Sequence, residues 1–382
     1  MIDRVGVVGA GTMGAGIAQL AAVAGSTTML FDVRRDLAET GKARVATALR
    51  KLAAAGKLAG DVAEVAIARI TPTDRLADLA VAGFVVEAAP EQIELKRSLF
   101  SELGRLCAAD AILATNTSSL SVGEIALAAS HPERVGGMHF FNPAPVMPLV
   151  EVVRARATAE TTVARVVEVA RAWGKTPVHV LDTPGFIVNR VARPFYLETF
   201  RMLEEGVAPI EVIDAALEGA GFRMGPGRLL DLIGIDVNWA VTRAVYEGFG
   251  RAPRFEPHPL QRRMVEEGRL GRKSGRGFYD YAPDAPGSPA RAAEVDRALA
   301  ASVVDRVVGC IVNEAALALG DAIASAADID LAMKLGTNYP KGPLAWGEEI
   351  GPARIVSLLR ALGAAHPERY PIAPRLLDGN LR

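Results

Sequence analysis

His139 and Glu151 are polar residues in strongly apolar surroundings, the first in G-G-M-H-F-F-N-P and the second in P-L-V-E-V-V. An imidazole among apolar neighbours needs a hydrogen-bond partner, because burial without one is costly. A carboxylate beside it would fix the imidazole tautomer and stabilise the imidazolium that forms on proton uptake. The two residues therefore predict an oriented general base. The same pattern also fits a buried His–Glu pair with a purely structural role.

A glycine-rich turn near the start of the chain predicts a dinucleotide site. Val5–Val8 form a short apolar strand, and Gly9, Gly11 and Gly14 follow as G-x-G-x-x-G before a helical pattern. The first glycine permits the tight turn, the second lets the backbone approach a pyrophosphate, and the third lets the helix pack on the strand. Asp32 ends the next strand 23 positions after Gly9, where a carboxylate would bind a ribose 2′-hydroxyl.

Asp32 also bears on the choice of cofactor. A carboxylate at this place repels the 2′-phosphate of NADP, so the sequence favours NAD. Arg34 and Arg35 follow closely and would accommodate a phosphate, which keeps NADP as an alternative. A glycine-rich β–α turn with no ligand is the remaining alternative.

Composition and charge narrow the class of protein. The chain has 382 residues, 50% of them hydrophobic, and a net charge of −1, so we expect neither a nucleic acid nor a membrane as partner. The uncharged run Val5–Phe31 contains six glycines and is typical of β-α-β rather than of a membrane span. Cys107 and Cys310 form neither a disulfide framework nor a metal-ligand spacing. We therefore expect a cytoplasmic protein without a metal site.

Strand and helix patterns alternate over residues 1–182. The predicted strands are Asp3–Val8, Thr27–Phe31, Ala68–Thr71, Phe84–Glu87, Ile112–Thr115, Gly136–Phe140, Val150–Arg154 and Pro177–Leu181. Helical patterns such as Gln92–Leu106 and Thr161–Trp173 lie between them. This alternation predicts an α/β Rossmann-type domain with a doubly wound, mostly parallel sheet. A helical hairpin, Leu37–Ala68, is inserted after the second strand.

Beyond residue 182 the strand signals stop and helical patterns follow. The predicted helices are Ile187–Glu205, Ile210–Gly219, Asp231–Gly248 and Pro259–Glu267. We expect a first all-α C-terminal domain over 183–282, a linker over 283–302 and a second helical domain over 303–382.

The second helical domain repeats the first. The matching positions, at an offset of 116 and then 117 residues, are Glu198, Asp214, Gly225-Pro226 and Ile233-Gly234 against Glu314, Asp330, Gly342-Pro343 and Ile350-Gly351. A helix, an acidic turn and a Gly-Pro loop that recur in order at a fixed spacing indicate a duplication.

Six motifs stand in an order that carries a family resemblance. They are V-G-A-G-T-M-G, V-V-E-A-A-P-E, T-N-T-S-S-L, G-M-H-F-F-N-P-A-P-V-M-P-L-V-E-V-V, D-T-P-G-F-I-V-N-R and L-G-R-K-S-G-R-G-F-Y-D-Y. In this order they resemble the L-3-hydroxyacyl-CoA dehydrogenases, whose short-chain group includes 3-hydroxybutyryl-CoA dehydrogenase. The resemblance implies NAD-dependent, reversible oxidation of a short-chain (S)-3-hydroxyacyl-CoA to the 3-oxoacyl-CoA. Such a step belongs to fatty acid β-oxidation, to aromatic-acid degradation or to polyester synthesis, and the sequence does not choose among them.

The resemblance also implies roles for individual residues. His139 takes the 3-hydroxyl proton and Glu151 orients it, while Ser118 and Asn189 bind the reacting end of the substrate. The residues expected to bind NAD are Gly9, Gly11, Gly14, Asp32, Glu91, Lys96, Asn142 and Lys273. From the residues alone, Ser118 and Asn189 also fit turn or helix-cap positions, and Lys273 also fits a solvated loop lysine.

The sequence departs from the family pattern in the helical hairpin. The stretch Thr47–Lys57, where relatives bind the CoA phosphates through serine and lysine, is rich in alanine and has Ala48 at the expected serine. Lys51 and Lys57 remain as the predicted phosphate contacts, and either also fits an exposed helix lysine. Pro148 replaces a lysine common in relatives, which we expect to matter little.

The duplication and the altered hairpin leave alternatives open. The resemblance implies that single-copy members of the family are dimers joined through the helical domain. We therefore expect either a homodimer or a pseudo-dimer within one chain. A dehydrogenase of a free hydroxy acid or sugar acid on the same fold is a second functional hypothesis. A non-catalytic NAD-binding scaffold is a third, which the presence of all four predicted catalytic residues disfavours.

Overall fold

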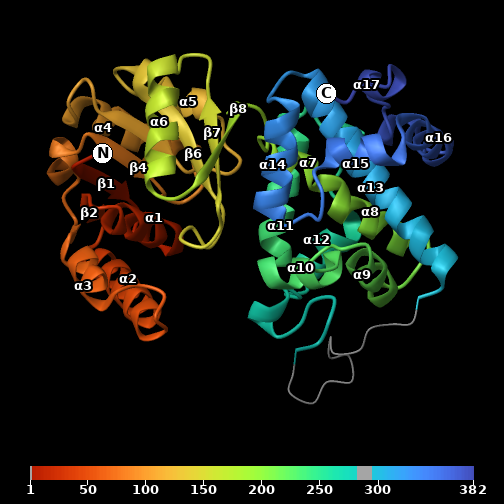
Figure 1. Ribbon diagram of the computed structural model, residues 1–382, viewed down its shortest axis with the longest axis horizontal. Helices are drawn as coiled ribbons and strands as arrows, with labels where there is room; N and C mark the ends of the chain where they lie inside the picture. The colour runs from red at the N-terminus through yellow and green to blue at the C-terminus, as the bar shows by residue number, and fades with distance from the viewer. Residues whose placement is uncertain (1, 282–294) are drawn as a thin grey trace. The chain divides into compact units, whose positions relative to one another are not determined.

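The computed structural model describes residues 2–281 and 295–382 (Figure 1). The chain divides into two compact units, Met1–Asp182 and Thr183–Arg382, which we call unit 1 and unit 2. Most of the predicted linker, 283–302, lies outside the described residues. A helix already begins at Arg297, within the range predicted as linker.

Unit 1 is built around one eight-stranded sheet. Its strands are β1 (Arg4–Val8), β2 (Thr27–Phe31), β3 (Ile70–Thr73), β4 (Phe84–Glu87), β5 (Ile112–Thr115), β6 (Val135–Phe140), β7 (Leu149–Arg154) and β8 (Thr176–Leu181). They lie in the order β3-β2-β1-β4-β5-β6-β7-β8, and all neighbours are parallel except β6 and β7. The predicted Rossmann-type, mostly parallel sheet is confirmed.

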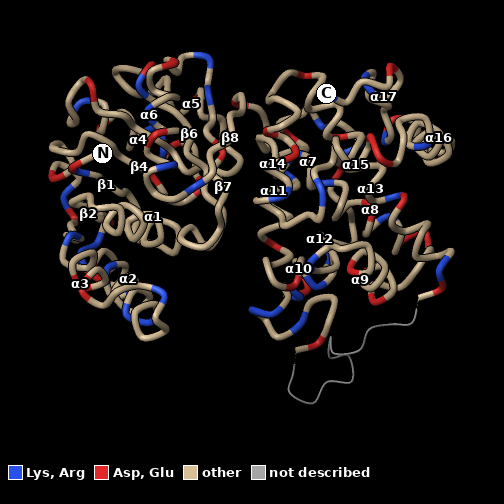
Figure 2. Tube along the Cα trace, in the orientation of Figure 1, with Lys and Arg blue, Asp and Glu red and all other residues tan. Residues whose placement is uncertain are grey.

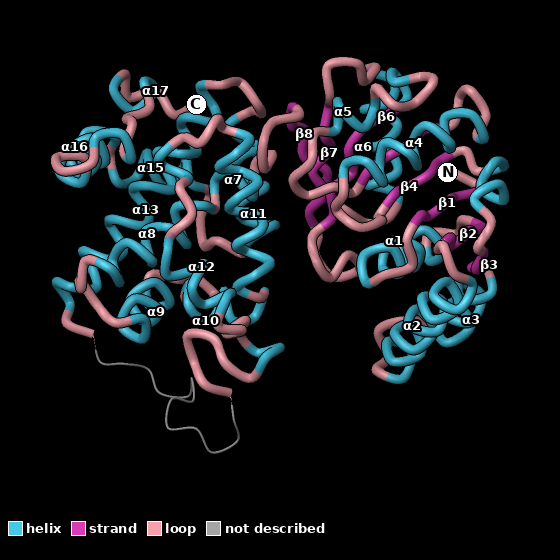
Figure 3. Tube along the Cα trace, turned by 180° about the vertical axis from the view of Figure 1, so that it is seen from behind, coloured by secondary structure: helices cyan, strands magenta, loops and turns pink. Residues whose placement is uncertain are grey.

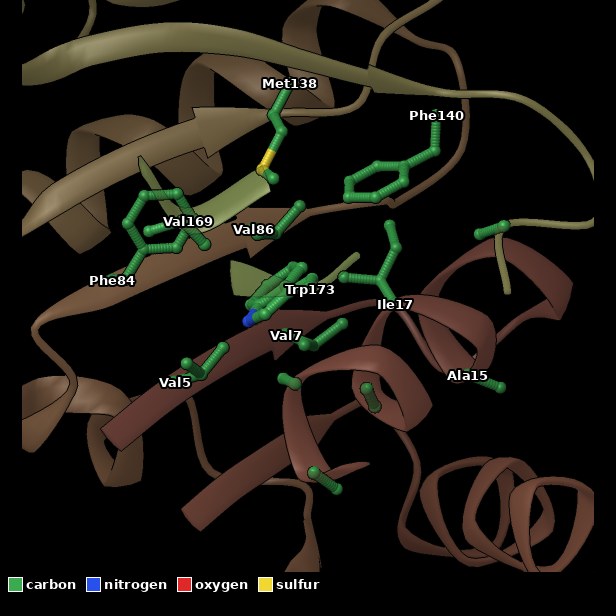
Figure 4. Packing of buried hydrophobic residues seen from close by; sticks show 14 of the residues in the cluster. Val5, Val7, Ala15, Ile17, Phe84, Val86, Met138, Phe140, Val169 and Trp173 are labelled. Atoms are coloured by element: carbon green, nitrogen blue, oxygen red, sulfur yellow. The ribbon is translucent and has the colours of Figure 1, made fainter. Parts of the chain in front are cut away.

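Helices cover both faces of this sheet (Figure 1). The helical elements of unit 1 are α1 (Thr12–Val23), α2 (Arg35–Ala54), α3 (Gly60–Ala68), η1 (Leu76–Val81), α4 (Ile93–Leu106), α5 (Val122–Ala126), η2 (Pro132–Arg134) and α6 (Glu160–Ala172). Strands covered on both sides read as continuous apolar runs, and β4 is buried at all four of its positions. Figure 4 shows side chains of β1 and β4 facing the indole of Trp173, which follows α6 and meets the Phe84 ring edge-on at 6.2 Å.

The predicted hairpin is the pair α2 and α3. It forms after β2, and Arg50 of α2 donates to both carboxylate oxygens of Glu64 on α3, at 2.7 and 2.9 Å. Both side chains are more than half exposed, so this ion pair adds little to stability. It does fix the two helices against each other at the outer end of the hairpin.

Unit 2 is built from helices (Figure 3). They are α7 (Val188–Val191), α8 (Arg193–Glu204), α9 (Ile210–Gly219), α10 (Pro226–Ile233), α11 (Ile235–Gly248), η3 (Pro253–Phe255), α12 (Pro259–Glu266), η4 (Arg272–Ser274), α13 (Arg297–Gly320), α14 (Ala326–Thr337), α15 (Pro343–Ile350), α16 (Pro352–Leu362), η5 (Pro367–Arg369) and α17 (Pro374–Leu377). Among the described residues, no helix is long and apolar enough to cross a membrane.

Two predicted helices are each divided in the structure. Ile187–Glu205 is interrupted at Ala192, because Pro194 has no N–H to continue the helical ladder. Asp231–Gly248 is interrupted at Gly234, whose φ of +104° is accessible mainly to glycine. The apolar periodicity runs through both breaks, so the sequence pattern alone did not reveal them.

The internal repeat is visible in the geometry of unit 2. Asp214 caps α10 by accepting two backbone N–H bonds of 2.8 and 3.1 Å, and Asp330 caps α15 with two bonds of 2.7 and 3.0 Å. A Cβ added at Gly225 or Gly342 would lie 2.4 or 2.3 Å from the capping aspartate. Each copy therefore needs the glycine of its Gly-Pro pair at the start of the helix, for the same steric reason.

Candidate active site

His139 and Glu151 face each other across two neighbouring strands of unit 1. The antiparallel register of β6 and β7 pairs the two residues, and His139 Nδ1 lies 2.7 Å from Glu151 Oε2. The carboxylate is 0% exposed and the histidine 5%. A neutral imidazole that donates its Nδ1–H to Glu151 carries its lone pair on Nε2. The arrangement therefore presents Nε2 as the atom that takes up a proton.

The Glu91 carboxylate gathers the loop that carries Ser118. Its Oε1 accepts the backbone N–H groups of Ser118 and Ser119, at 2.8 and 2.9 Å, and the hydroxyls of Thr117, Ser118 and Ser119, at 2.7, 3.1 and 3.0 Å. Burial acts to raise the pKa of Glu91, but Lys96 and these hydrogen bonds outweigh it, so the pKa lies below its usual value. Glu91 thus fixes the Ser118 loop, and its contact with NAD stays a prediction.

Lys96 lies beneath this loop rather than on the surface. Its side chain is 1% exposed, and its Nζ donates to Glu87 Oε1 at 2.6 Å and lies 3.4 Å from Glu91 Oε2. Glu87 in turn accepts the hydroxyl of Thr115 at 2.7 Å. A buried ion pair with this many hydrogen bonds is satisfied internally. The structure therefore gives Lys96 a supporting place, and its predicted contact with NAD stays a prediction.

The glycine-rich turn has the geometry that a dinucleotide needs. Gly9 has a φ of +94°, and a Cβ added at Gly14 would lie 1.7 Å from the carbonyl oxygen of Gly9. A Cβ added at Gly11 would meet no protein atom within 4 Å. Asp32 Oδ2 accepts the N–H of Ala10 at 2.8 Å, which places the carboxylate beside the turn. The residues present therefore fit a bound dinucleotide, with Gly11 on the side open to a ligand.

Substituting alanine at Gly11 and at Gly14 separates binding from folding. We expect Gly11→Ala to weaken NADH binding at least about tenfold with an unchanged melting temperature, because its methyl group would meet only the pyrophosphate. Gly14→Ala should cost about 3 kcal/mol of folding stability, because its methyl group would clash with backbone. Fluorescence titration with NADH and thermal unfolding measure the two effects. Equal affinity of Gly11→Ala and wild type would contradict the proposed place of the cofactor.

Other predicted residues of unit 1 lie at its surface. Asn142 is exposed in the loop after β6, and Lys51 and Lys57 are exposed near the outer end of α2 and beyond it. Figure 2 shows basic residues along this hairpin, interspersed with acidic ones. Arg50 is paired with Glu64. The two lysines therefore remain as the candidate phosphate-binding cations near that end of the hairpin.

Asn189 and Lys273 belong to unit 2. Asn189 is half-buried on α7, and its carbonyl accepts Arg193 Nε at 2.7 Å. Lys273 is exposed and forms an ion pair of 2.6 Å with Asp236. The structure thus supplies a structural partner for Lys273, and the roles of both residues toward substrate and cofactor stay predictions.

Two site residues were missed in the sequence. Asn116 Oδ1 accepts the N–H of Phe140 at 2.8 Å, which ties the Ser118 loop to the strand of His139. Asp182 caps α5 by accepting Ser121 Oγ and two backbone N–H groups, at 2.7 to 3.1 Å. Both residues stand inside conspicuous motifs, T-N-T-S-S-L and D-T-P-G-F. The polar side chain within each motif was the sequence feature that could have pointed to these roles.

Comparison with known proteins places the chain in a family. Residues 4–183 match the model described as "3-hydroxyacyl-CoA dehydrogenase, NAD binding domain", and 185–281 and 303–381 both match "3-hydroxyacyl-CoA dehydrogenase, C-terminal domain". The chain belongs to the 3-hydroxyacyl-CoA dehydrogenase family. It is an NAD-dependent oxidoreductase of that family, and two segments of its helical unit match the same C-terminal domain model.

One relative in this family covers nearly the whole chain, and another covers about three quarters of it. The 3-hydroxyadipyl-CoA dehydrogenase of Escherichia coli K12 is 39% identical over 97% of this chain and 95% of its own. The 3-hydroxybutyryl-CoA dehydrogenase of Mycobacterium tuberculosis is 43% identical over 73% of this chain and 99% of its own. A crystal structure of 3-hydroxybutyryl-CoA dehydrogenase from Escherichia coli K12 superposes with a TM-score of 0.91, with 38% identity and coverage of 99% and 98%.

Proposed function

We propose that this chain oxidises short-chain (S)-3-hydroxyacyl-CoA thioesters to 3-oxoacyl-CoA with NAD, reversibly, as a step of fatty acid β-oxidation. The observation that carries the proposal is the buried His139–Glu151 pair on β6 and β7, in the same sheet as the glycine-rich turn. Oxidation of a secondary alcohol needs one base for the hydroxyl proton and one hydride acceptor. The pair supplies the first, and NAD, when bound at the turn, supplies the second.

The residues of the chain divide the remaining work. His139 Nε2 takes the proton of the 3-hydroxyl group, and Glu151 stabilises the imidazolium that results. Ser118, whose backbone N–H stays bonded to Glu91, turns its hydroxyl from Glu91 to donate to the 3-oxygen and so fixes the carbinol for transfer. Asn189 stays a predicted substrate contact. Gly9, Gly11, Gly14 and Asp32 hold the dinucleotide. In the reverse direction His139 returns the proton to the 3-oxygen.

The thioester preference rests on the helical hairpin. Lys51 and Lys57 are exposed cations near its outer end, which suits the phosphates of CoA. Relatives whose names specify a 3-hydroxybutyryl or a 3-hydroxyadipyl thioester support a CoA substrate of short acyl length. Because the hairpin is rich in alanine, phosphate recognition depends on these two lysines.

The test compares acetoacetyl-CoA with free acetoacetate, each with NADH and separately with NADPH. We expect rapid oxidation of NADH with the thioester and at least about tenfold lower kcat/KM with NADPH, because Asp32 repels the 2′-phosphate. The double variant Lys51→Ala, Lys57→Ala should raise the KM for the thioester and leave kcat unchanged, since those contacts are equal in ground and transition states. Turnover of free acetoacetate as fast as of the thioester would favour a free-acid dehydrogenase instead.

For assembly we favour a pseudo-dimer within one chain. Arg190 Nε donates to Glu314 at 2.7 Å, and Arg306 Nε donates to Glu198 at 2.7 Å. Positions 306 and 314 lie 116 residues after positions 190 and 198 and are their counterparts in the repeat. Each arginine therefore binds the glutamate of the other copy. Reciprocal contacts of this kind define a two-fold interface. The two helical copies therefore pack on each other as two subunits of a symmetric dimer would.

Two further equivalent residues meet each other directly. Phe222 and Tyr339 lie 117 residues apart in the chain, and their rings contact edge-on at 5.0 Å. A residue that touches its own counterpart lies on the symmetry axis. The face that a second chain would use is thus already covered by the second copy.

Sedimentation equilibrium tests this arrangement. We expect a species near 40.3 kDa, the mass of one chain, across the micromolar range. A dimer that persists in the wild type but dissociates on Phe222→Glu would contradict the pseudo-dimer, because that dimer would use the face assigned to the second copy.

For the compartment we propose the cytoplasm, which suits the two buried thiols of Cys107 and Cys310, neither of which forms a disulfide.

A further inference from the structure

A buried lysine holds the loop that joins the strands of His139 and Glu151. Residues 141–148 connect β6 to β7, and Lys175 stands at the corner between α6 and β8. Lys175 is 7% exposed, and its Nζ donates to the carbonyl oxygens of Ala144 at 2.6 Å and Met147 at 2.9 Å. The two acceptors lie five residues after His139 and four before Glu151. One ammonium group therefore ties both arms of the loop, just beyond the catalytic pair.

Lys175 differs from the other buried lysine of unit 1 in its partners. Lys96 is paired with Glu87 at 2.6 Å, whereas within residues 2–281 and 295–382 no carboxylate lies within ion-pair distance of Lys175. Burial lowers the pKa of Lys175 to about 8. An ammonium that is buried against carbonyl oxygens alone lowers the stability of the fold. The presence of Lys175 at this place therefore indicates a role other than stabilisation.

The ionisable groups on the surrounding elements are few. The loop 141–148 and helix α1 carry none. On the other elements packed here they are Glu160, Arg165, Glu168 and Arg171 of α6, His179 of β8, and Glu151 and Arg154 of β7. Glu168 pairs with Arg165, and Glu160 pairs with Arg154. His179 is exposed and Glu151 binds His139. The charge of Lys175 is thus directed at the loop carbonyls.

The opposite side of the loop rests on the dinucleotide helix. A Cβ added at Gly16 of α1 would lie 2.9 Å from Pro145 Cδ and 3.2 Å from Ala144 Cβ. The helix begins directly after the glycine-rich turn. The loop is therefore enclosed between Lys175 and α1, and its position relates the catalytic hairpin to the cofactor turn.

We propose that Lys175 is a positioning residue: its charged ammonium holds the loop 141–148 against α1, and so sets the place of His139 and Asn142 relative to the cofactor turn. Lys175 acts through the loop and touches neither substrate nor cofactor. The inference rests on the proposed function for its effect on rate. Its effect on the loop is independent of that function.

The variants Lys175→Met and Lys175→Arg test the proposal in the oxidation direction. We expect kcat of Lys175→Met to fall about 10- to 100-fold, because a small displacement of a catalytic group costs this much, with Lys175→Arg recovering most of it. Wild-type kcat should decline above about pH 8, where the ammonium loses its proton. In Lys175→Arg that alkaline decline should disappear, because guanidinium stays charged. The exposed Lys334→Met, in unit 2, serves as the matched control and should change neither quantity.

A second readout does not depend on turnover. Amide hydrogen exchange across residues 141–148 should be at least tenfold faster in Lys175→Met than in wild type, and unchanged in Lys334→Met. If wild type turns over no thioester, the proposed function fails while the exchange result still decides the role of Lys175. A Lys175→Met protein with wild-type kcat and exchange overturns the proposal. If that variant does not fold, an alkaline decline that stays at pH 8 in Lys175→Arg overturns it.

Discussion

Replacing His139 by glutamine is expected to lower kcat for 3-hydroxybutyryl-CoA oxidation by about 10³-fold, within the range that general acid–base catalysis contributes. Glutamine keeps a polar side chain of similar reach next to Glu151 but has no group that takes up a proton near neutral pH. The KM values for thioester and NAD should change little, because the side chain contributes to the reaction rather than to binding. Steady-state kinetics in the oxidation direction measure both.

The matched control is His131→Gln. His131 lies in the same unit, is about half exposed and faces Glu133 at 3.1 Å, so it repeats the residue change away from the site. We expect wild-type kinetics from it. A His139→Gln enzyme that kept a tenth or more of wild-type kcat would show that another group takes the hydroxyl proton.

Replacing Glu151 by glutamine should have the second largest effect, a loss of about 10²-fold in kcat. The amide is nearly isosteric, but its NH₂ group donates where the carboxylate accepts at 2.7 Å from Nδ1. The imidazole would then place its proton on Nε2, the nitrogen that must accept one. Loss of the buried negative charge also removes the stabilisation of the imidazolium.

Thermal unfolding separates this effect from a simple loss of structure. The thermal midpoint should fall by only a few degrees, because the amide fills the same volume. An unchanged kcat in Glu151→Gln would mean that the pair is structural, which the sequence pattern alone also allows.

Much of the fold was predictable because its signals are local. The strand Phe84–Glu87 begins with three consecutive apolar residues, as expected for a strand covered on both faces, and its bounds agree with the prediction. The turn at Gly9 and Gly14 was predictable because backbone sterics there admit only glycine. Helix interruptions at Ala192 and Gly234 were not, because apolar periodicity continues through them.

The candidate site was predictable only where polarity contrasts with its surroundings. His139 and Glu151 stood out because each is a lone polar side chain in an apolar run, and the register of β6 and β7 pairs them. Glu91 was assigned to NAD, whereas five donors from the Ser118 loop converge on it. Those donors lie 26 to 28 residues away in the chain, so only the fold reveals the convergence. Lys175 was missed for the same reason.

The most direct test follows the hydride in the wild type and in the variant that lacks the base. (S)-3-Hydroxybutyryl-CoA carrying deuterium at C3 is mixed with NAD and either wild type or His139→Gln, and the reduced nucleotide is followed by absorbance and mass. We expect wild type to transfer the deuterium to the nicotinamide rapidly, and His139→Gln to form the same labelled product about 10³-fold more slowly. Labelled product at wild-type rate from the variant would contradict the account, and so would a wild-type enzyme that binds both ligands and forms none.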